Sequence, residues 1–298
     1  MMQYTEAHTY IKMFVQTAKG KHKNVTMILS LSPKERKTRG KTMNKRVFGL
    51  FMSLLAAFVL CLTVAAQGYS WYFKPANDGK RPMLCPEADF VKNYDAVTVG
   101  NEGEKKIYLT FDAGYENGNV EKILDILKAN EVKGTFFILP RLAEHNTDLC
   151  KRMKEEGHIV GNHSVHHRNM GMYGDIESFR KEVEPLDAFF EEKTGYKMDK
   201  FFRPPEGAFS ENTLKFAERL GYTTVFWSLA YADWDNNKQM NPDKALQLLL
   251  SRTHDGCVLL LHPTSETNTK ILDRYIKTMK ERGYEFGLVN ELKKSTDG

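Results

Sequence analysis

Apolar and polar residues follow two alternating patterns from about residue 105 onward. Short apolar runs typical of buried strands occur at 106–112, 133–139, 158–163, 200–203, 223–229, 257–262 and 285–289. Helix-like runs lie between them, at 119–130, about 141–156, 176–194, 211–220, 242–253 and 267–282. Several helix-like runs end at a residue that favours a left-handed C-terminal cap, namely Gly157, Gly195, Gly221 and Gly283.

This alternation of strands and helices predicts an α/β fold with a parallel sheet covered by helices. About seven strands in roughly 190 residues fit either an open doubly wound sheet or a barrel. No GxGxxG follows the first strand and no GxxxxGK[ST] occurs, so nucleotide binding has no support.

Polar residues at the ends of the strand-like runs favour the barrel. Each of five runs ends at, or shortly before, a residue able to do chemistry: Asp112, His163, Arg203, Asp233 and His262. In parallel α/β folds the carboxyl ends of the strands converge on one face, where active sites form. We therefore expect these five side chains to meet at one site.

The residues before this region have a different character. Residues 47–66 form an uncharged stretch, "VFGLFMSLLAAFVLCLTVAA", preceded by Lys45 and Arg46. This pattern predicts a signal peptide or signal anchor at 43–66; a buried core helix is the alternative. We interpret 1–42 as a mis-assigned or unstructured leader, and 67–103 as a linker or an arm packed on the main domain.

The charge is concentrated in the leader. Residues 1–66 hold 11 basic and 2 acidic residues, a net of +9, whereas the remainder holds 32 and 36, a net of −4. The main domain therefore gives no electrostatic reason to expect a nucleic acid partner. Three cysteines follow the leader without a CxxC motif, so we predict neither a cysteine zinc site nor a disulfide.

The histidine-rich stretch "GNHSVHH" contains a pair with metal-ligand spacing. His163 and His167 are four residues apart, which lets two imidazoles reach one ion; an exposed polar loop is the alternative. We interpret His166 as a supporting or surface residue.

Three further stretches carry polar residues at strand ends. Arg203 in "FFRPPEG" can bind a carboxylate through its fork, or lie on the surface beside a proline turn. Asp233 and Trp234 suit a sugar ring, or form a core tryptophan with a helix cap. His262 ends an apolar strand, where it can act as a general acid or simply bind backbone. Jointly they predict a metal-assisted hydrolase.

The same residues resemble the polysaccharide deacetylases, the NodB-homology family or carbohydrate esterase family 4. Five motifs of that family occur in order over about 105–290, namely Thr110-Phe111-Asp112-Ala113-Gly114 for TFDDG, His163 to His167 for H[ST]xxH, Arg203 to Gly207 for RxPxG, Asp233-Trp234 for the end of DxxDW, and Leu260 to His262 for LxH.

The resemblance implies a distorted (β/α) barrel of about seven parallel strands over residues 104–295. It implies that Asp112 is the base that activates water, that Arg203 holds Asp112, and that His262 is the acid, oriented by Asp233. His163 and His167 are implied to bind a divalent metal ion, usually zinc-like. Trp234, Glu206 and Tyr115 are expected to contact the substrate, with a backbone N–H near Glu206 helping to hold the oxyanion.

Two positions depart from the family pattern. Ala113 stands where the family's second aspartate binds the metal, and Ala230 replaces the first aspartate of DxxDW. The stretches "TFDAGYENG" and "WSLAYADW" are similar to the delta-lactam-biosynthetic deacetylases, which act on N-acetylmuramic acid during spore cortex maturation and also lack that second aspartate. We therefore expect weaker metal binding than in the wider family.

The first hypothesis is thus a secreted or membrane-anchored, monomeric deacetylase of N-acetylmuramic acid in peptidoglycan. A deacetylase of N-acetylglucosamine in peptidoglycan or another polysaccharide is the second. A non-catalytic glycan-binding protein is the third, motivated by Ala113 and Ala230 but opposed by an intact Asp112 and His262. Contact with a membrane is expected only through the N-terminal segment.

Overall fold

The main sheet is built from short strands whose side chains are almost all buried. The structure is a computed structural model that describes residues 68–292. The strands of its main sheet are β4 (Ala96–Val97), β5 (Lys106–Ala113), β6 (Thr135–Ile138), β7 (Ile159–Asn162), β8 (Phe201–Phe202), β10 (Thr223–Val225), β11 (Cys257–Leu261) and β12 (Glu285–Gly287).

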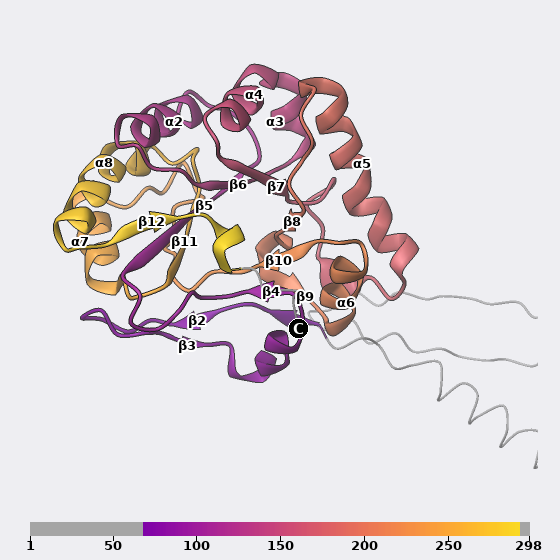
Figure 1. Cartoon of the computed structure of the whole chain (residues 1–298), viewed down its shortest axis with the longest axis horizontal. Helices are drawn as coiled ribbons and strands as arrows, with labels where there is room; N and C mark the ends of the chain where they lie inside the picture. Colours follow the sequence, from indigo (N-terminus) through magenta and orange to yellow (C-terminus); the bar gives the residue numbers. More distant parts are fainter. Residues whose placement is uncertain (1–67, 293–298) are drawn as a thin grey trace, which may run out of the picture. The chain divides into compact units, whose positions relative to one another are not determined.

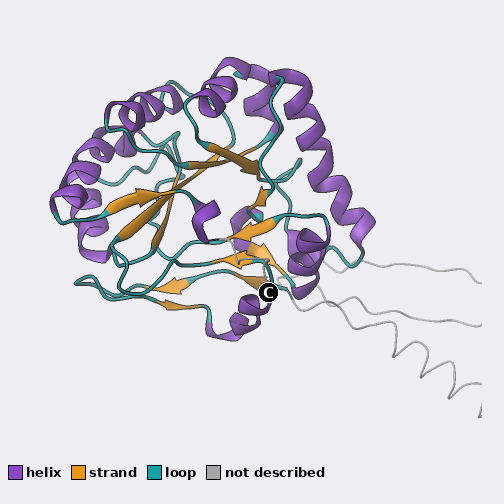
Figure 2. Ribbon diagram, viewed as in Figure 1, coloured by secondary structure: helices purple, strands orange, loops and turns teal. Residues whose placement is uncertain are grey.

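These strands are all parallel and curl into a partly closed barrel (Figure 2). Their order is β11-β5-β6-β7-β8-β10-β4, and β12 also pairs with β5. Leu229, just beyond β10, forms a parallel bridge with Leu259 of β11, so the two ends of the sheet approach each other. The predicted distorted barrel of about seven strands is confirmed, and β4 is an eighth strand that was not predicted.

Helices form an outer layer around this sheet (Figure 1). They are α2 (Val120–Ala129), α3 (Pro140–His145), α4 (Thr147–Glu155), α5 (Ile176–Thr194), α6 (Glu211–Arg219), α7 (Pro242–Arg252) and α8 (Glu266–Glu281). The four glycines expected after helices all have positive φ, from 77° to 82°, as that prediction requires. The single helix predicted over about 141–156 was wrong, because the chain leaves the helical region at Asn146, between α3 and α4.

Alternate residues of β5 face two different cores. Leu109, Phe111 and Ala113 belong to the large hydrophobic cluster shared with the helices. Tyr108 instead belongs to the cluster that fills the barrel interior with residues such as Val225 and Val258. Because side chains alternate along a strand, Thr110 and Asp112 share the inward direction of Tyr108. This periodicity brings the Asp112 carboxylate to the mouth of the barrel.

The segment before β5 packs against the sheet. β1 (Tyr69–Ser70) pairs antiparallel with β9 (Ala208–Phe209), and β2 (Phe73–Lys74) pairs with β3 (Met83–Leu84). The short helix η1 (Pro86–Asn93) follows and leads into β4. The segment interpreted as a linker or arm therefore contributes one strand to the main sheet.

The predicted leader and signal segments, residues 1–66, lie outside the described residues. Between residues 68 and 292, no helix has the length and apolar character needed to cross a membrane. Within the same range Cys85, Cys150 and Cys257 are buried free thiols.

Candidate active site

The five predicted side chains do meet, at a pocket of about 810 Å³ over the carboxyl ends of the strands. The pocket is lined by Asp112, Gly114, Tyr115, Leu139, His163, His167, Glu206, Trp227, Ala230, Tyr231, Ala232, Trp234, Leu260, His262 and Thr264. Arg203 and Asp233 lie behind this lining and contact Asp112 and His262, respectively.

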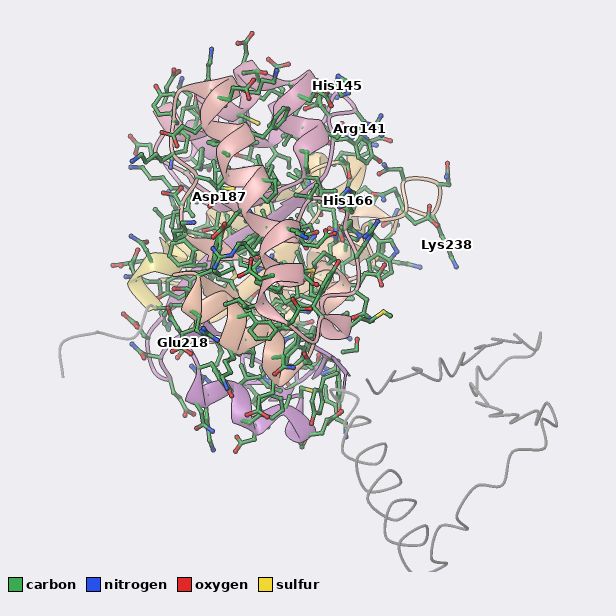
Figure 3. The ribbon with its side chains drawn as sticks, turned by 90° about the vertical axis from the view of Figure 1, so that its right-hand side faces the viewer. Arg141, His145, His166, Asp187, Glu218 and Lys238 are labelled. Atoms are coloured by element: carbon green, nitrogen blue, oxygen red, sulfur yellow. The ribbon has the colours of Figure 1, made fainter. Side chains whose placement is uncertain are left out.

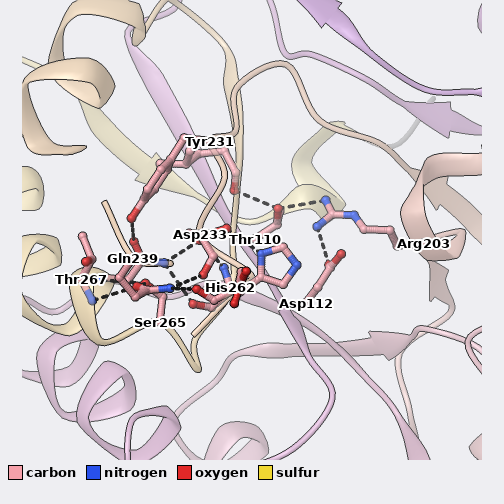
Figure 4. A network of polar contacts seen from close by, with 12 residues as sticks. Thr110, Asp112, Arg203, Tyr231, Asp233, Gln239, His262, Ser265 and Thr267 are labelled. Carbon is pink, nitrogen blue, oxygen red and sulfur yellow. Dashed lines mark hydrogen bonds and ion pairs between the residues drawn. The ribbon is translucent and has the colours of Figure 1, made fainter. Parts of the chain in front are cut away.

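The Asp112 carboxylate is held by a fully buried arginine. Arg203 Nη1 donates to Asp112 Oδ1 at 2.9 Å, and Nη2 donates to Thr110 Oγ1 at 2.9 Å (Figure 4). The guanidinium lies over the ring of Phe137, with its Cζ 4.3 Å from the ring centroid. Stacking on Phe137 and hydrogen bonds to two neighbouring side chains fix the guanidinium plane, and with it the direction of the carboxylate.

The arginine is satisfied on its other edge by backbone. Its Nε donates to the Val225 carbonyl and its Nη2 to the Phe226 carbonyl, and the side chain is 0% exposed. Burial raises the pKa of Asp112, but the charge of Arg203 and those of nearby histidines outweigh it, so the net shift is downward. Asp112 is therefore an ionised acceptor at neutral pH.

His262 is held by a second buried carboxylate. Its Nδ1 donates to Asp233 Oδ1 at 2.7 Å, and its backbone N–H donates to Asp233 Oδ2 at 2.7 Å. Burial lowers the pKa of His262. The hydrogen bond and charge of Asp233, with the charge of Asp112, raise it by more, so the net shift is upward. Because Nδ1 is engaged by Asp233, Nε2 is left for the pocket, and the raised pKa favours a proton there.

Sequence reasoning missed the residues that fix Asp233. Asn268 Nδ2 donates to Asp233 Oδ2 at 2.6 Å and to the His262 carbonyl at 3.0 Å. Tyr231 donates its hydroxyl hydrogen to Asn268 Oδ1, and Gln239 Nε2 donates to the Asp233 carbonyl (Figure 4). Asn268 lies in the first turn of α8, directly after the loop that carries His262, which is the only sequence signal for its place.

The two predicted metal-binding histidines also face each other. The ring centroids of His163 and His167 are 5.1 Å apart, and His163 Nε2 lies 3.5 Å from Asp112 Oδ2. His163 Nδ1 donates to the Arg203 carbonyl at 2.9 Å, which leaves Nε2 with a free lone pair. Burial, chiefly, lowers the pKa of His163 to about 4, so its imidazole is neutral at neutral pH.

These side chains fit a divalent cation with an incomplete set of protein ligands. Two imidazoles and an adjacent carboxylate are donors that zinc accepts. Between residues 68 and 292, however, no three His, Cys, Asp or Glu side chains are placed closely enough to hold an ion without rearrangement. Ala113 contributes a methyl group that is fully buried in the apolar cluster. Water or substrate must therefore supply part of any coordination shell.

Three residues in or next to the pocket wall have an unusual backbone. Ser164, His167 and Glu206 have φ values of 70°, 52° and 55°, which side-chain-bearing residues rarely adopt. Such strain is typical of functional loops. In two of the three cases it sets a predicted site residue, His167 or Glu206, against the pocket.

Aromatic residues form the rim. Trp234 is 62% exposed, and its ring lies 6.3 Å from that of His262. Tyr115 accepts a hydrogen bond from Asn236 Nδ2 at 2.8 Å and carries the Arg141 guanidinium over its ring. An exposed indole and an anchored phenol offer flat apolar faces of the kind on which sugar rings stack.

Two charged residues near the rim are unpaired with opposite charges in the described part of the chain. Exposed Arg141 has no carboxylate within ion-pair distance, and Glu206 has no cation within that distance. Figure 3 shows Arg141 near His145, toward the edge from which the Lys238 loop projects. His166, by contrast, contacts Glu182 of α5 at 3.0 Å and does not line the pocket.

Comparison with known proteins is consistent with this geometry. A family model described as "Polysaccharide deacetylase" matches residues 99–225. The peptidoglycan-N-acetylmuramic acid deacetylase PdaA of Bacillus subtilis is 38% identical over 248 residues, which cover 80% of this chain and 94% of PdaA. A peptidoglycan-N-acetylglucosamine deacetylase of Bacillus cereus is 33% identical over 201 residues, covering 66% and 71% of the two chains.

A solved structure agrees with these sequence matches. The structure of Bacillus subtilis PdaA, described as a family 4 carbohydrate esterase, superposes with a TM-score of 0.72 at 39% identity. The superposition covers 76% of this chain and 97% of that one. The likeness therefore covers nearly the whole length of the PdaA chain.

Proposed function

Since the chain belongs to the polysaccharide deacetylase family, carbohydrate esterase family 4, we propose that it removes the N-acetyl group from N-acetylmuramic acid in peptidoglycan. The observation that carries this proposal is the pairing in one pocket of Asp112, held by buried Arg203, with His262, held by buried Asp233. Amide hydrolysis needs both a base and an acid, and a protein that only bound glycan would need neither.

The reaction adds water across the acetyl C–N bond and yields acetate and a free amine. In our proposal Asp112 takes a proton from the attacking water, and Arg203 keeps that carboxylate ionised and aimed. His262 gives a proton to the departing nitrogen, with Asp233 and Asn268 fixing its ring. We expect a backbone N–H near Glu206, which lines the pocket, to help hold the oxyanion.

Metal binding is assigned to His163 and His167, with Asp112 beside them. A bound divalent ion, which we expect to be zinc, would acidify water and polarise the acetyl carbonyl. The chain's own contribution is a neutral His163 oriented by the Arg203 carbonyl and an exposed His167 fixed through its backbone N–H to Ser164 Oγ. The missing carboxylate at Ala113 predicts weak binding.

The choice between muramic and glucosaminyl sugars depends on charge at the rim. The lactyl group of muramic acid carries a carboxyl group, and Arg141 offers an unpaired cation next to Tyr115. The relationship to PdaA supports the same choice. Glu206 favours the second candidate, N-acetylglucosamine, because its unpaired carboxylate repels a lactyl carboxylate but not an uncharged sugar.

We further propose that the product leads to muramic delta-lactam in spore cortex. The freed amine and the lactyl carboxyl group of one sugar can condense into a six-membered lactam once the stem peptide is absent. The proposed location is extracytoplasmic, secreted or held at the membrane by residues 43–66, with the enzyme acting as a monomer on glycan strands. Support comes from the apolar, basic-flanked pattern of that segment.

The deciding experiment is mass spectrometry of digested peptidoglycan, with and without stem peptides, after treatment with the enzyme and Zn²⁺. The proposal expects muramic residues to lose about 42 Da, the mass of an acetyl group less one hydrogen, and glucosaminyl residues to be unchanged. The same loss on glucosaminyl residues establishes the second candidate. No loss on either sugar, with any divalent metal, refutes both.

A further inference from the structure

We propose that Trp71 is a positioning residue for the Arg203–Asp112 pair. This inference rests on the proposed function, and it concerns a residue that precedes the family-matched range 99–225. Trp71 lies just after β1, is 5% exposed, and does not line the pocket. It contacts two chain segments: the one whose carbonyl groups bind Arg203, and the loop that begins at Arg203.

The first of these segments is Val225 to Trp227, at and just beyond the end of β10. The Trp71 indole Nε1 donates to the Trp227 carbonyl at 2.8 Å. Its ring stacks on Phe226, with centroids 4.4 Å apart and planes 23° apart. Arg203 in turn donates to the carbonyls of Val225 and Phe226. A shift of this backbone would therefore move two of the acceptors that fix the guanidinium.

The second segment is the loop from Arg203 to Gly207. The Trp71 backbone N–H donates to the Gly207 carbonyl at 2.8 Å, and β1 pairs with β9 directly after that loop. A Cβ atom placed on Gly207 would lie 3.0 Å from Trp71 Cβ and 2.8 Å from Trp227 Cη2. Trp71 thus packs against the bare face of Gly207, which follows the left-handed Glu206.

Trp71 therefore holds together the two backbone segments that surround the arginine. One segment is the Val225–Trp227 backbone, and the other is the loop that begins at Arg203. Loss of the Trp71 contacts would leave Arg203 and Asp112 unchanged but would let the carbonyl groups that orient Arg203 move. Loss of orientation lowers the rate of the chemical step more than it lowers substrate binding.

The test uses Trp71→Phe in the full-length chain, which keeps a ring against Phe226 and removes the Nε1–H donor. Tyr72→Phe is the matched control, because Tyr72 lies next to Trp71 but donates its hydroxyl to Glu87 on the surface. We expect Trp71→Phe to lower kcat for acetate release about 10-fold with KM changed less than about twofold. The control should stay within about twofold of wild type in both.

A second readout needs no turnover. The Nε–H of Arg203 is buried and bonded to the Val225 carbonyl, so its hydrogen exchange, followed by ¹⁵N NMR, reports how firmly the guanidinium is held. We expect Trp71→Phe, and not Tyr72→Phe, to speed this exchange about 10-fold. Trp71→Phe is the deciding variant, because Trp71→Ala also removes a large buried side chain and puts folding at risk.

The outcomes separate this inference from the proposed function. An inactive wild-type chain whose Arg203 exchange still responds to Trp71→Phe refutes the function and leaves the positioning role in place. Unchanged exchange refutes the positioning role, as does a variant with a lower melting temperature but unchanged kcat. A change confined to KM also refutes it.

Discussion

The two halves of the pocket are supported very differently. In the acid–base half, formed by Asp112, Arg203, Asp233 and His262, each carboxylate accepts hydrogen bonds from a fixed partner, and Arg203 and Asp233 are almost fully buried. In the imidazole half, formed by His163 and His167, His163 is buried whereas His167 lies exposed on a left-handed backbone.

This difference separates what the protein provides from what must be added. In the proposed reaction, proton transfer uses side chains that the chain holds in place by itself. The proposed metal site would instead use two imidazoles, with no third ligand in position among the described residues. The chain should therefore behave as an enzyme with intact acid–base chemistry and conditional metal occupancy.

The largest effect should come from the acid–base half. Asp112→Asn keeps the shape and the bond from Arg203 but removes the base, so we expect kcat to fall by about 10²- to 10⁴-fold. Acetate release across a series of Zn²⁺ concentrations checks this, since added metal should not restore the rate. Activity within about tenfold of wild type would assign the base to another group.

Substitutions in the imidazole half should be rescued by added metal, unlike Asp112→Asn. His167→Gln should weaken Zn²⁺ binding by at least about 10-fold, because even changes to groups that support metal ligands cost 10- to 100-fold. Calorimetric titration measures the affinity, and higher Zn²⁺ should recover much of the rate. His166→Gln is the control, since His166 points to Glu182. Equal Zn²⁺ affinity in wild type and His167→Gln contradicts the ligand assignment.

A carboxylate introduced at position 113 tests why Zn²⁺ binding at the imidazole half is expected to be weak. Ala113→Asp should lower the free energy of unfolding by roughly 1–3 kcal/mol without metal, because it buries a polar group in the apolar cluster. Added Zn²⁺ should then raise the melting temperature by more than it does for wild type. Ala113→Asn serves as the uncharged control. A Zn²⁺-induced shift equal to that of wild type would show that the missing carboxylate is not what limits binding.

The pairing of His262 with Asp233 should be visible in the pH dependence of kcat/KM. Asp233→Asn keeps an acceptor oxygen for His262 Nδ1 but removes the negative charge that helps to raise the pKa of His262, so burial then lowers that pKa. His262 must be protonated to donate, so the alkaline limb of kcat/KM should move to lower pH. The ion pair also stabilises the fold below the unfolded-state pKa of histidine, and this stability is lost as the pH rises through the raised pKa. An unmoved alkaline limb removes His262 from the role of acid.

The smallest effect concerns the choice of sugar. Arg141→Gln should lower kcat/KM about 2- to 5-fold for muramic substrates with a free lactyl carboxylate, as for a solvent-exposed ion pair. Glucosaminyl substrates should be unaffected. Lys238→Gln, on the neighbouring loop, is the control for general surface charge. Equal losses on both sugars would mean that Arg141 does not read the carboxylate.

The sequence predicted the main strands and the meeting of the five polar side chains, because parallel strands place their carboxyl ends together. It did not predict β4 or β9, whose two residues are too few to show a period. The break between α3 and α4 was also missed, because no Gly or Pro marks it near Asn146. Tyr231 and Trp71 make contacts distant in sequence, so no local pattern marks them.

The most direct test of the contrast between the two halves is acetate release from a defined muramic glycan after chelation, followed by a Zn²⁺ titration. We predict that chelation abolishes release and that graded Zn²⁺ restores it to a plateau in wild type, while Asp112→Asn stays inactive at every concentration. Full activity of the chelated wild-type enzyme, or restoration of Asp112→Asn by metal, would contradict this account.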